Sequence, residues 1–441
     1  MAILSTFRKY LFRDLVWSIL AAVSMQGSVL VSGMLAARLL GLSVFGKYAL
    51  LVTTVMTAAA IAQSGAGSVV AKFVAEYRVS DPERIGTVLW FCRRVTVVMG
   101  LIAVAVLLFG APVFAHSVFK QPDLEPVIRL VAPAIFFQVM VTYQQGALQG
   151  FAAFKTLGRI STVSGLAFLV LPPLGAKLGG LDGAALGFVA ASLARAMFFY
   201  VALHTTACDM LAGVSLTVRR DDIGRLLHFG IPAGLSSLVT LPCIWLVSVF
   251  LARAPNGLEM VAIFSVATQL RMATLQLPTL LNGVTLSVMN TLFGQRSAHE
   301  FRSVFRTTLI ANGVFSVLVV AVLVACSPLI LGLYGRQFSD GRGALILLLL
   351  SVIPEILAAT VYHVINTFGR MWMSLFFIIT PVNVSYMLIA ASLTPTMGVG
   401  GAALAYLVAQ GLNLIATAAV ARLAARDHVL QDRHPGGTAN G

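Results

Sequence analysis

The residues that could do chemistry are charged side chains inside long apolar runs. Arg195 lies near the centre of one run, Arg271 lies within another, and Glu355 follows Pro354 in a third. An arginine at the centre of a lone membrane helix costs about 2.5–3.5 kcal/mol on insertion scales, so it should face a protein interior, a water-filled cavity or an anion. Because a planar guanidinium can hold two phosphate oxygens at once, both arginines are candidate contacts to an anionic solute.

Two further arginines allow two interpretations, and so does the acid Glu355. Arg38 and Arg253 end apolar runs 215 positions apart, where an arginine is either an interface anchor or, by its symmetric placement, part of a polar cavity. Glu355 is the one clear acid within an apolar run. It could carry a proton or a cation, or it could be the structural partner of an arginine.

The sequence lacks the motifs of common enzymes and cofactor sites. Cys92, Cys208, Cys243 and Cys326 lie far apart with no CxxC pair, which predicts neither a disulfide framework nor a metal site. A GxxxxGK spacing begins at Gly41, but Tyr48 stands where a phosphate loop needs Ser or Thr. There is no HExxH or GxSxG motif. We therefore expect a protein that is not an enzyme and binds no cofactor.

The composition is that of a membrane protein. Of 441 residues, 59% are hydrophobic and only 10% are charged, against about 25% in soluble domains, and the mean hydropathy is +0.92. The net charge of +14 comes from basic residues that lie between apolar runs, which is a topology signal. This distribution disfavours soluble enzymes and nucleic-acid binding.

Twelve apolar runs of spanning length predict twelve transmembrane helices. Barrel strands are disfavoured because they would show about ten residues of strict alternation. The fold class expected is an all-α polytopic membrane protein. The runs are 15–37, 46–71, 88–111, 125–150, 156–178, 183–206, 226–251, 258–291, 307–332, 343–367, 371–393 and 398–421.

Basic residues set the expected orientation. With the N-terminus in the cytoplasm, twenty Lys and Arg fall on the cytoplasmic side and eight on the other side. The positive-inside rule therefore predicts that both termini are cytoplasmic. The first run is long enough to span a bilayer, so we expect it to be a retained helix and not a cleaved signal peptide.

Internal matches near half the chain length predict a repeat. Gly183-Ala184-Ala185-Leu186 recurs at 401–404, and Pro112 and Pro328 follow equivalent runs. Six crossings return the chain to its starting side, so the two halves form a parallel repeat. We expect six-helix lobes at 1–206 and 226–422, a cytoplasmic linker at 207–225 and a disordered cytoplasmic tail at 423–441.

Amide and imidazole side chains within the runs are expected mainly to join helices by hydrogen bonds. They are Gln63, Gln144, Gln145, Gln269, Asn282, Asn312, His363, Asn366, Asn383, Gln410 and Asn413.

Short motifs connect the chain with a family. Ala37-Arg38-Leu39-Leu40-Gly41, followed by Phe45-Gly46-Lys47-Tyr48, resembles the first hairpin of Wzx-type polysaccharide flippases. Leu148-Gln149-Gly150 with Lys155, and the start of the sixth run at 183–185, resemble the same family. These flippases share a superfamily with lipid II flippases and with multidrug and toxin extrusion antiporters.

The resemblance implies two lobes around a V-shaped central cavity that opens alternately to each side. It implies transfer of an undecaprenyl-pyrophosphate-linked oligosaccharide from the cytoplasmic to the periplasmic leaflet of the bacterial inner membrane, for exopolysaccharide, O-antigen or lipopolysaccharide synthesis. Arg38, Arg253, Arg271 and, less securely placed, Arg195 would bind the pyrophosphate. Membrane lipids, a polysaccharide polymerase and chain-length proteins are the partners it implies.

Two alternatives remain open. An ion-coupled multidrug antiporter of the same superfamily would use Glu355 to exchange a proton or Na⁺ for a cationic drug. A membrane-bound polymerase or a scaffold of the same glycan pathway is the second alternative. The short loops on the outer side weaken it, because a polymerase is expected to carry its catalytic residues there.

Overall fold

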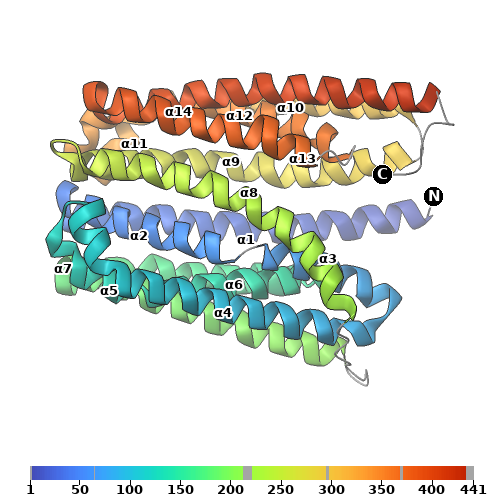
Figure 1. The fold of residues 1–441 in the computed structure, drawn as a ribbon, viewed down its shortest axis with the longest axis horizontal. Coiled ribbons are helices and arrows are strands. Elements are labelled where there is room, and N and C mark those ends of the chain that lie inside the picture. Colours follow the sequence, from blue (N-terminus) through green and yellow to red (C-terminus); the bar gives the residue numbers. More distant parts are fainter. Residues whose placement is uncertain (1, 64, 212–220, 295–296, 368–370, 434–441) are drawn as a thin grey trace. The chain divides into compact units, whose positions relative to one another are not determined.

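A computed structural model describes residues 2–63, 65–211, 221–294, 297–367 and 371–433 of the chain. All regular structure in these ranges is helical (Figure 1). The α-helices are α1 (Ala2–Leu40), α2 (Leu42–Ala62), α3 (Ala66–Ser80), α4 (Ile85–Pro112), α5 (Glu125–Val131), α6 (Pro133–Gly150), α7 (Phe154–Met210), α8 (Asp221–Ala252), α9 (Gly257–Gly294), α10 (Ala298–Ala325), α11 (Ser327–Tyr334), α12 (Arg342–Thr367), α13 (Met371–Ser374) and α14 (Thr380–Arg433). Short helical turns are η1 (Pro82–Arg84), η2 (Val113–Val118), η3 (Pro122–Leu124), η4 (Arg336–Gly341) and η5 (Leu375–Ile379).

The predicted apolar runs all lie on helices. Within the described ranges, nine helical segments are long and apolar enough to cross a membrane. Two of these segments, 154–210 and 372–423, each hold two predicted runs. Within α8, Val239–Ala252 is a shorter apolar helical stretch. The all-α membrane fold expected from the sequence is therefore confirmed.

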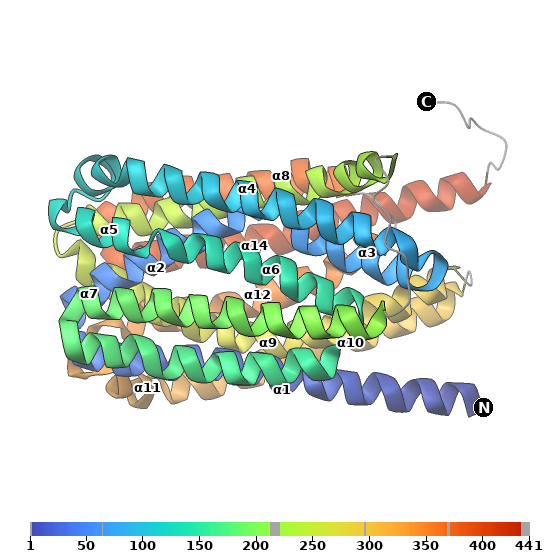
Figure 2. The same ribbon diagram turned by 90° about the horizontal axis from the view of Figure 1, so that it is seen from below.

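Glycines divide the two long segments into pairs of helices. In α7, Gly180 has φ 55° and ψ −130°, and in α14, Gly398 has φ 56° and ψ −132°. Residues other than glycine rarely adopt this backbone conformation, so the chain reverses at these two positions. The two halves of α7 then pack backbone to backbone, because a Cβ on Gly183 would lie 2.0 Å from the carbonyl oxygen of Gly175 (Figure 2). The same turn recurs 218 positions apart, as the predicted repeat requires.

Two other predicted runs are each broken into two helices. The run 46–71 forms α2 and α3, and Gly65 precedes α3 with a left-handed φ of 74°. The run 125–150 forms α5 and α6, which begins at Pro133. Proline lacks the N–H that would continue the hydrogen-bond ladder, so it starts a helix more readily than it extends one.

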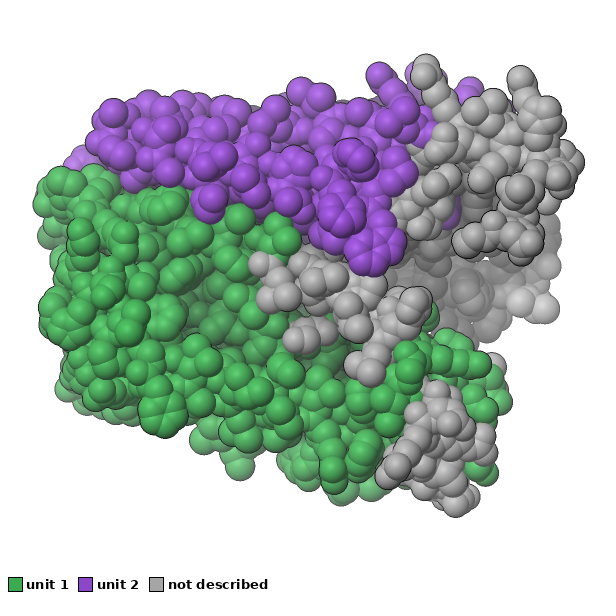
Figure 3. Space-filling view, viewed as in Figure 1, with its two compact units in different colours: residues 1–266, 332–338 green, residues 267–331, 339–441 purple. Residues whose placement is uncertain are grey.

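The contacts divide the chain into two compact units (Figure 3). Unit 1 holds residues 1–266 and 332–338, and unit 2 holds 267–331 and 339–441. In unit 1, α7 packs along α1 and α6, and α6 packs against α3 and α4. In unit 2, α12 packs against α10 and α14.

The predicted lobe boundaries and the V-shaped cavity stay predictions. Residues 212–220 of the predicted linker and 434–441 of the predicted tail lie outside the described residues. The helix α14 continues to Arg433, past the predicted lobe end at 422, through a stretch that includes the strong helix formers Leu423, Ala424 and Ala425.

Each unit has its own apolar core. The core of unit 1 includes the fully buried side chains of Val70, Ile85 and Phe199, from α3, α4 and α7. The core of unit 2 includes Met289 of α9 and Ile365 of α12. These packed side chains fix the helices that carry the polar groups described next.

Candidate functional site

Unit 2 contains a buried ion pair between two membrane-spanning helices. Arg271 of α9 donates from Nη1 to both carboxylate oxygens of Glu355 on α12, at 2.6 Å to Oε2 and 2.8 Å to Oε1. The side chain of Arg271 is 4% exposed and that of Glu355 is 22% exposed. Opposite charges so placed neutralise one another within an apolar bundle. The structure thus pairs Glu355 with an arginine, and its predicted role in ion coupling stays a prediction.

Two tyrosines of α14 complete this cluster. The Tyr406 hydroxyl donates to Glu355 Oε1 at 3.2 Å, and the Arg271 guanidinium lies 4.4 Å from the centre of the Tyr406 ring. Tyr386 packs edge-on against Tyr406 with ring centroids 5.2 Å apart. The aromatic face attracts the guanidinium and shields the pair from solvent, so three helices hold the cluster in one geometry.

Several polar atoms on α9 and α12, the helices that carry the ion pair, have no protein partner within the described part of the chain. Arg271 Nε and Gln269 Oε1 are buried without a hydrogen bond within the described part of the chain. The same holds for both ring nitrogens of His363 and for Asn366 Oδ1. Glu355, His363 and Asn366 recur at helical spacing on one side of α12. Buried polar atoms are normally paired, so this strip of α12 requires water or a polar ligand.

A separate network in unit 2 is structural. Asn312 of α10 donates from Nδ2 to Asn282 Oδ1 at 2.8 Å and to Thr360 Oγ1 at 2.9 Å. These bonds join α9, α10 and α12, so the interhelical role predicted for Asn282 and Asn312 is confirmed.

Arg195 lies in the second half of α7 in unit 1. It is half-buried, its guanidinium lies 5.6 Å from the centre of the Phe199 ring, and its Nε is buried with no hydrogen-bond partner among the described residues. One turn earlier, Ser192 accepts a bond from Gln138 of α6 at 3.1 Å. Arg195 thus carries its charge into the helix bundle without a counterion from the described chain.

Arg38 and Arg253 bind backbone carbonyls at helix ends. Arg38 donates from Nε to the Leu333 oxygen at 2.6 Å and from Nη2 to the Gly332 oxygen at 3.4 Å. Arg253 uses the same two nitrogens for the oxygens of Val118 and Ser117, each at 2.7 Å. Carbonyls at a helix C-terminus lack intrahelical partners and attract cations, so both arginines act as caps. Their predicted substrate-binding role stays a prediction.

A pocket of about 390 Å³ in unit 1 is lined by polar side chains and glycines. Gln63, Gln145 and Gln149 contribute amides, and Ser68 and Thr142 contribute hydroxyls. Each amide offers both donors and acceptors, which matches the hydroxyl groups of a sugar. This pocket therefore provides hydrogen bonds for a neutral polar ligand.

The pocket lies where two helices approach closely. A Cβ on Gly146 of α6 would lie 2.2 Å from the carbonyl oxygen of Gly67 on α3. Only glycine permits this approach of the two backbones.

The structure brings Arg271 and Glu355 together and places Arg38, Arg195 and Arg253 in separate contacts. Sequence reasoning missed Tyr386, Tyr406, Ser68 and Thr142. The tyrosines sit in an apolar run like any packing aromatic, so no local signal distinguishes them.

Comparison with known proteins assigns the chain to a family. A family model described as polysaccharide biosynthesis protein matches residues 11–293, which is more than half of the chain. No curated protein matches the chain closely enough to be a relative.

Solved structures share the fold. An inward-facing multidrug resistance MATE family transporter of the MOP superfamily is 15% identical with a TM-score of 0.77, and the match covers 93% of this chain and 99% of that one. A MOP superfamily transporter from Pyrococcus furiosus, whose reverse polarity of binding pocket suggests a different function, is 17% identical with a TM-score of 0.69 and 96% coverage of both chains. An outward-facing MATE family transporter is 17% identical with a TM-score of 0.67, covering 93% and 95%.

These identities show the fold alone, which is the two-lobed helical fold of MATE transporters. The apolar helices and this fold make the chain a multi-pass membrane protein. The family match leads to one conclusion: the chain belongs to the polysaccharide biosynthesis protein family.

Proposed function

We propose that this protein transports a polyprenyl-pyrophosphate-linked oligosaccharide from the cytoplasmic to the periplasmic leaflet of the bacterial inner membrane by alternating access. The family match supports a role in polysaccharide synthesis, and the fold supports transport. Such a substrate has three chemically different parts, namely sugars, a pyrophosphate and a lipid tail. The lipid tail stays in the bilayer, so the protein has to accommodate the sugars and the pyrophosphate.

The observation that carries the proposal is the unfilled hydrogen-bonding capacity of Arg271. Glu355 takes bonds from Nη1 only, and the buried Nε has no partner within the described residues. A guanidinium has five N–H donors in a fixed fork, so Arg271 can bind a phosphate oxygen while it keeps Glu355. The unpartnered nitrogens of His363 and the nearby amides add further bonds for the substrate.

The amide pocket of unit 1 supports a glycan part. Gln63, Gln145 and Gln149 surround a glycine-lined space without a formal charge among the residues that line it. Neutral amides suit sugars of varied composition, because they donate and accept without selecting one charge. In this proposal the amide pocket of unit 1 binds sugars, and Arg271 of unit 2 binds the pyrophosphate.

The ion pair weighs against drug–cation exchange. Away from helix ends, Glu355 is the one acid in the spanning segments that the structure describes, and Arg271 and Tyr406 already engage it. A carboxylate that exchanges a cation for a proton has to be available to both. Here the arginine supplies the countercharge permanently.

The test is lipid-linked oligosaccharide transfer in liposomes. A fluorescent polyprenyl-pyrophosphate oligosaccharide is placed on one leaflet, and its appearance on the other is followed by accessibility to a membrane-impermeant quencher. We expect protein-dependent transfer that falls at least about tenfold in Arg271→Gln, since losing a hydrogen bond to a charged group costs about 1.5–3 kcal/mol.

Arg129→Gln is the matched control. Arg129 pairs with Glu125 at 2.7 Å on the surface of α5, and an exposed pair of this kind contributes about 0–1 kcal/mol. Its loss should leave transfer unchanged. Absence of transfer with several glycans, together with efflux of cationic dyes that Glu355→Gln abolishes, would favour the antiporter instead.

A further inference from the structure

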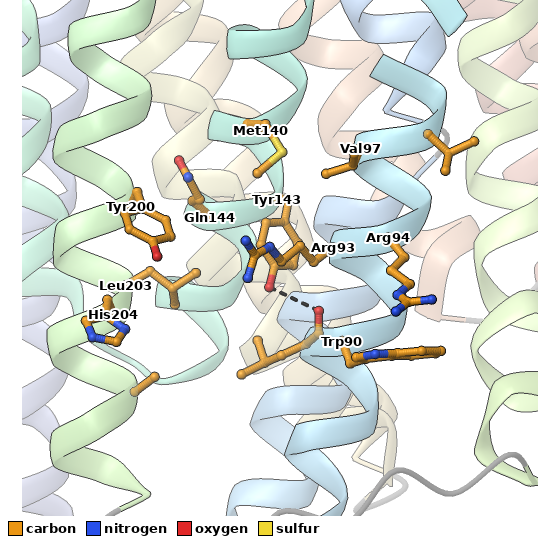
Figure 4. Close-up of a pocket in the computed structure, with 13 residues that line it drawn as sticks. Trp90, Arg93, Arg94, Val97, Met140, Tyr143, Gln144, Tyr200, Leu203 and His204 are labelled. Carbon is orange, nitrogen blue, oxygen red and sulfur yellow. Dashed lines mark hydrogen bonds between the residues drawn. The ribbon is translucent and has the colours of Figure 1, made fainter. Parts of the chain in front are cut away.

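Unit 1 contains a second, larger pocket that the proposed function does not use. Its volume is about 610 Å³, and it lies between α4, α6 and the second half of α7 (Figure 4). Arg93, Arg94 and Trp90 come from α4, Gln144 from α6, and Tyr200 and His204 from α7. It shares no lining residue with the amide pocket.

The pocket is basic. Arg93 and Arg94 both line it, both are exposed, and no Asp or Glu is among the lining residues. Neither guanidinium has an ion-pair partner in the part of the chain that the structure describes. The Arg94 guanidinium lies 4.4 Å from the centre of the Trp90 ring, which leaves its N–H groups available at the ring's edge (Figure 4). A pocket lined by two guanidinium groups and no carboxylate is suited to phosphate oxygens.

Polar residues other than the arginines also line this space. Gln144 lies at its wall and is 2% exposed. Tyr200 and His204 stack at 6.2 Å with nearly parallel rings. A ligand that carries a phosphate would pair with the cations of this pocket.

An apolar surface continues from the polar end of the pocket along α4. Val98, Ile102 and Val106 follow Arg94 on this helix and are 51%, 51% and 60% exposed. On α7, Met197 and Val201 are each 59% exposed. A free phosphate would gain no binding free energy from this apolar surface. An acyl chain that packs along it would bury its own apolar surface away from water.

The length of the helix predicts that the arginines lie at headgroup depth. The helical segment 82–118 is 37 residues long, or about 55 Å, which exceeds the roughly 30 Å thickness of the hydrocarbon core. Arg93 follows Ile85 by about 12 Å of helix, so it falls near the polar boundary at this end. The distribution of basic residues predicts that this end is cytoplasmic. Trp90 and Tyr200 match the aromatic residues that occupy such boundaries.

We propose that this pocket, defined by Arg93, Arg94, Trp90, Gln144, Tyr200 and His204, binds the phosphate headgroup of an anionic phospholipid. The acyl chains lie along the exposed apolar residues of α4 and α7. The site is separate from substrate transfer and does not rest on the proposed function.

Trp90 provides a direct probe. A variant with Trp17, Trp245 and Trp372 replaced by phenylalanine keeps Trp90 as its one tryptophan. It is reconstituted in phosphatidylcholine bilayers that contain increasing fractions of brominated phosphatidylglycerol or brominated phosphatidylcholine. We expect the charged lipid to quench Trp90 with about tenfold preference, since each basic residue near the surface favours anionic lipid. High salt should reduce this preference.

Paired variants distinguish the site from general surface charge. Arg93→Gln with Arg94→Gln should remove the preference, whereas Arg302→Gln with Arg306→Gln, the same charge change on exposed residues of α10, should keep it. Arg93→Lys with Arg94→Lys retains the charge and should keep most of the preference. Equal quenching by both brominated lipids, or a preference that survives in the Arg93 and Arg94 glutamine variant, would overturn the proposal. Relief of quenching by glycerol 3-phosphate in the buffer would overturn it in favour of a soluble phosphate.

Discussion

Replacing one partner of the ion pair between Arg271 and Glu355 should destabilise unit 2 more than replacing both partners. In Glu355→Gln, Arg271 stays buried without a countercharge, and breaking a buried pair in this way costs about 3–5 kcal/mol. Because the Glu355 side chain is 22% exposed, we expect the lower end, about 3 kcal/mol. In a domain of 150–250 residues, each kcal/mol of lost stability lowers the unfolding temperature by about 2–4 °C. The unfolding temperature should therefore fall by roughly 6–12 °C.

The two single variants should differ. In Arg271→Met, the remaining carboxyl can bind a proton and become neutral, whereas a guanidinium cannot lose its proton in a protein. Arg271→Met should therefore lower the unfolding temperature less than Glu355→Gln. The double variant carries no buried charge, and it should unfold within about 3 °C of the wild type, since uncharged replacements of buried pairs are often neutral.

Thermal unfolding of the detergent-purified protein, followed by tryptophan fluorescence, measures these differences. Tyr406→Phe is the control, because it removes the hydrogen bond of 3.2 Å to Glu355 and keeps the ring against Arg271. It should cost about 1 kcal/mol. If the effects of Arg271→Met and Glu355→Gln simply add in the double variant, the two side chains do not interact and the reasoning fails.

Three further predictions test other parts of the structure. Gly146→Val should abolish accumulation of folded protein in membranes, measured by fluorescence-detected size exclusion, because the added Cβ would lie 2.2 Å from the Gly67 oxygen. Gln145→Ala should slow glycan-lipid transfer severalfold in liposomes without changing the unfolding temperature, since it removes hydrogen bonds to sugars and none to the described protein. Arg38→Gln and Arg253→Gln should each lower the free energy of unfolding by about 1 kcal/mol in denaturant titrations, and clearly unequal effects would contradict the equivalence of their contacts.

Much of the fold could be predicted because the bilayer restricts it. Apolar runs of spanning length have to be helices, and Gly180 and Gly398 lie between runs where the chain has to turn. The break at Gly65 was missed, since membrane helices often tolerate single glycines. Hydropathy measures the length of apolar sequence and does not register a local change in helix direction.

The site was less predictable because pairing depends on tertiary structure. Arg271 and Glu355 stood out as charges in apolar sequence, but their contact joins residues 84 positions apart. Tyr406 carried no local signal. Arg93 and Arg94 were counted only as topology determinants, since nothing in their immediate sequence distinguishes a lipid-binding arginine from one that faces the cytoplasm.

The caps formed by Arg38 and Arg253 have a consequence for synthesis of the chain. Each arginine binds carbonyls from the other half of the sequence, since Arg253 lies 215 positions after Arg38 and Leu333 lies 215 positions after Val118. In a nascent chain that ends before residue 253, the carbonyls of Ser117 and Val118 lack the arginine that binds them. Arg38 can bind its carbonyls only after residue 333 has left the ribosome.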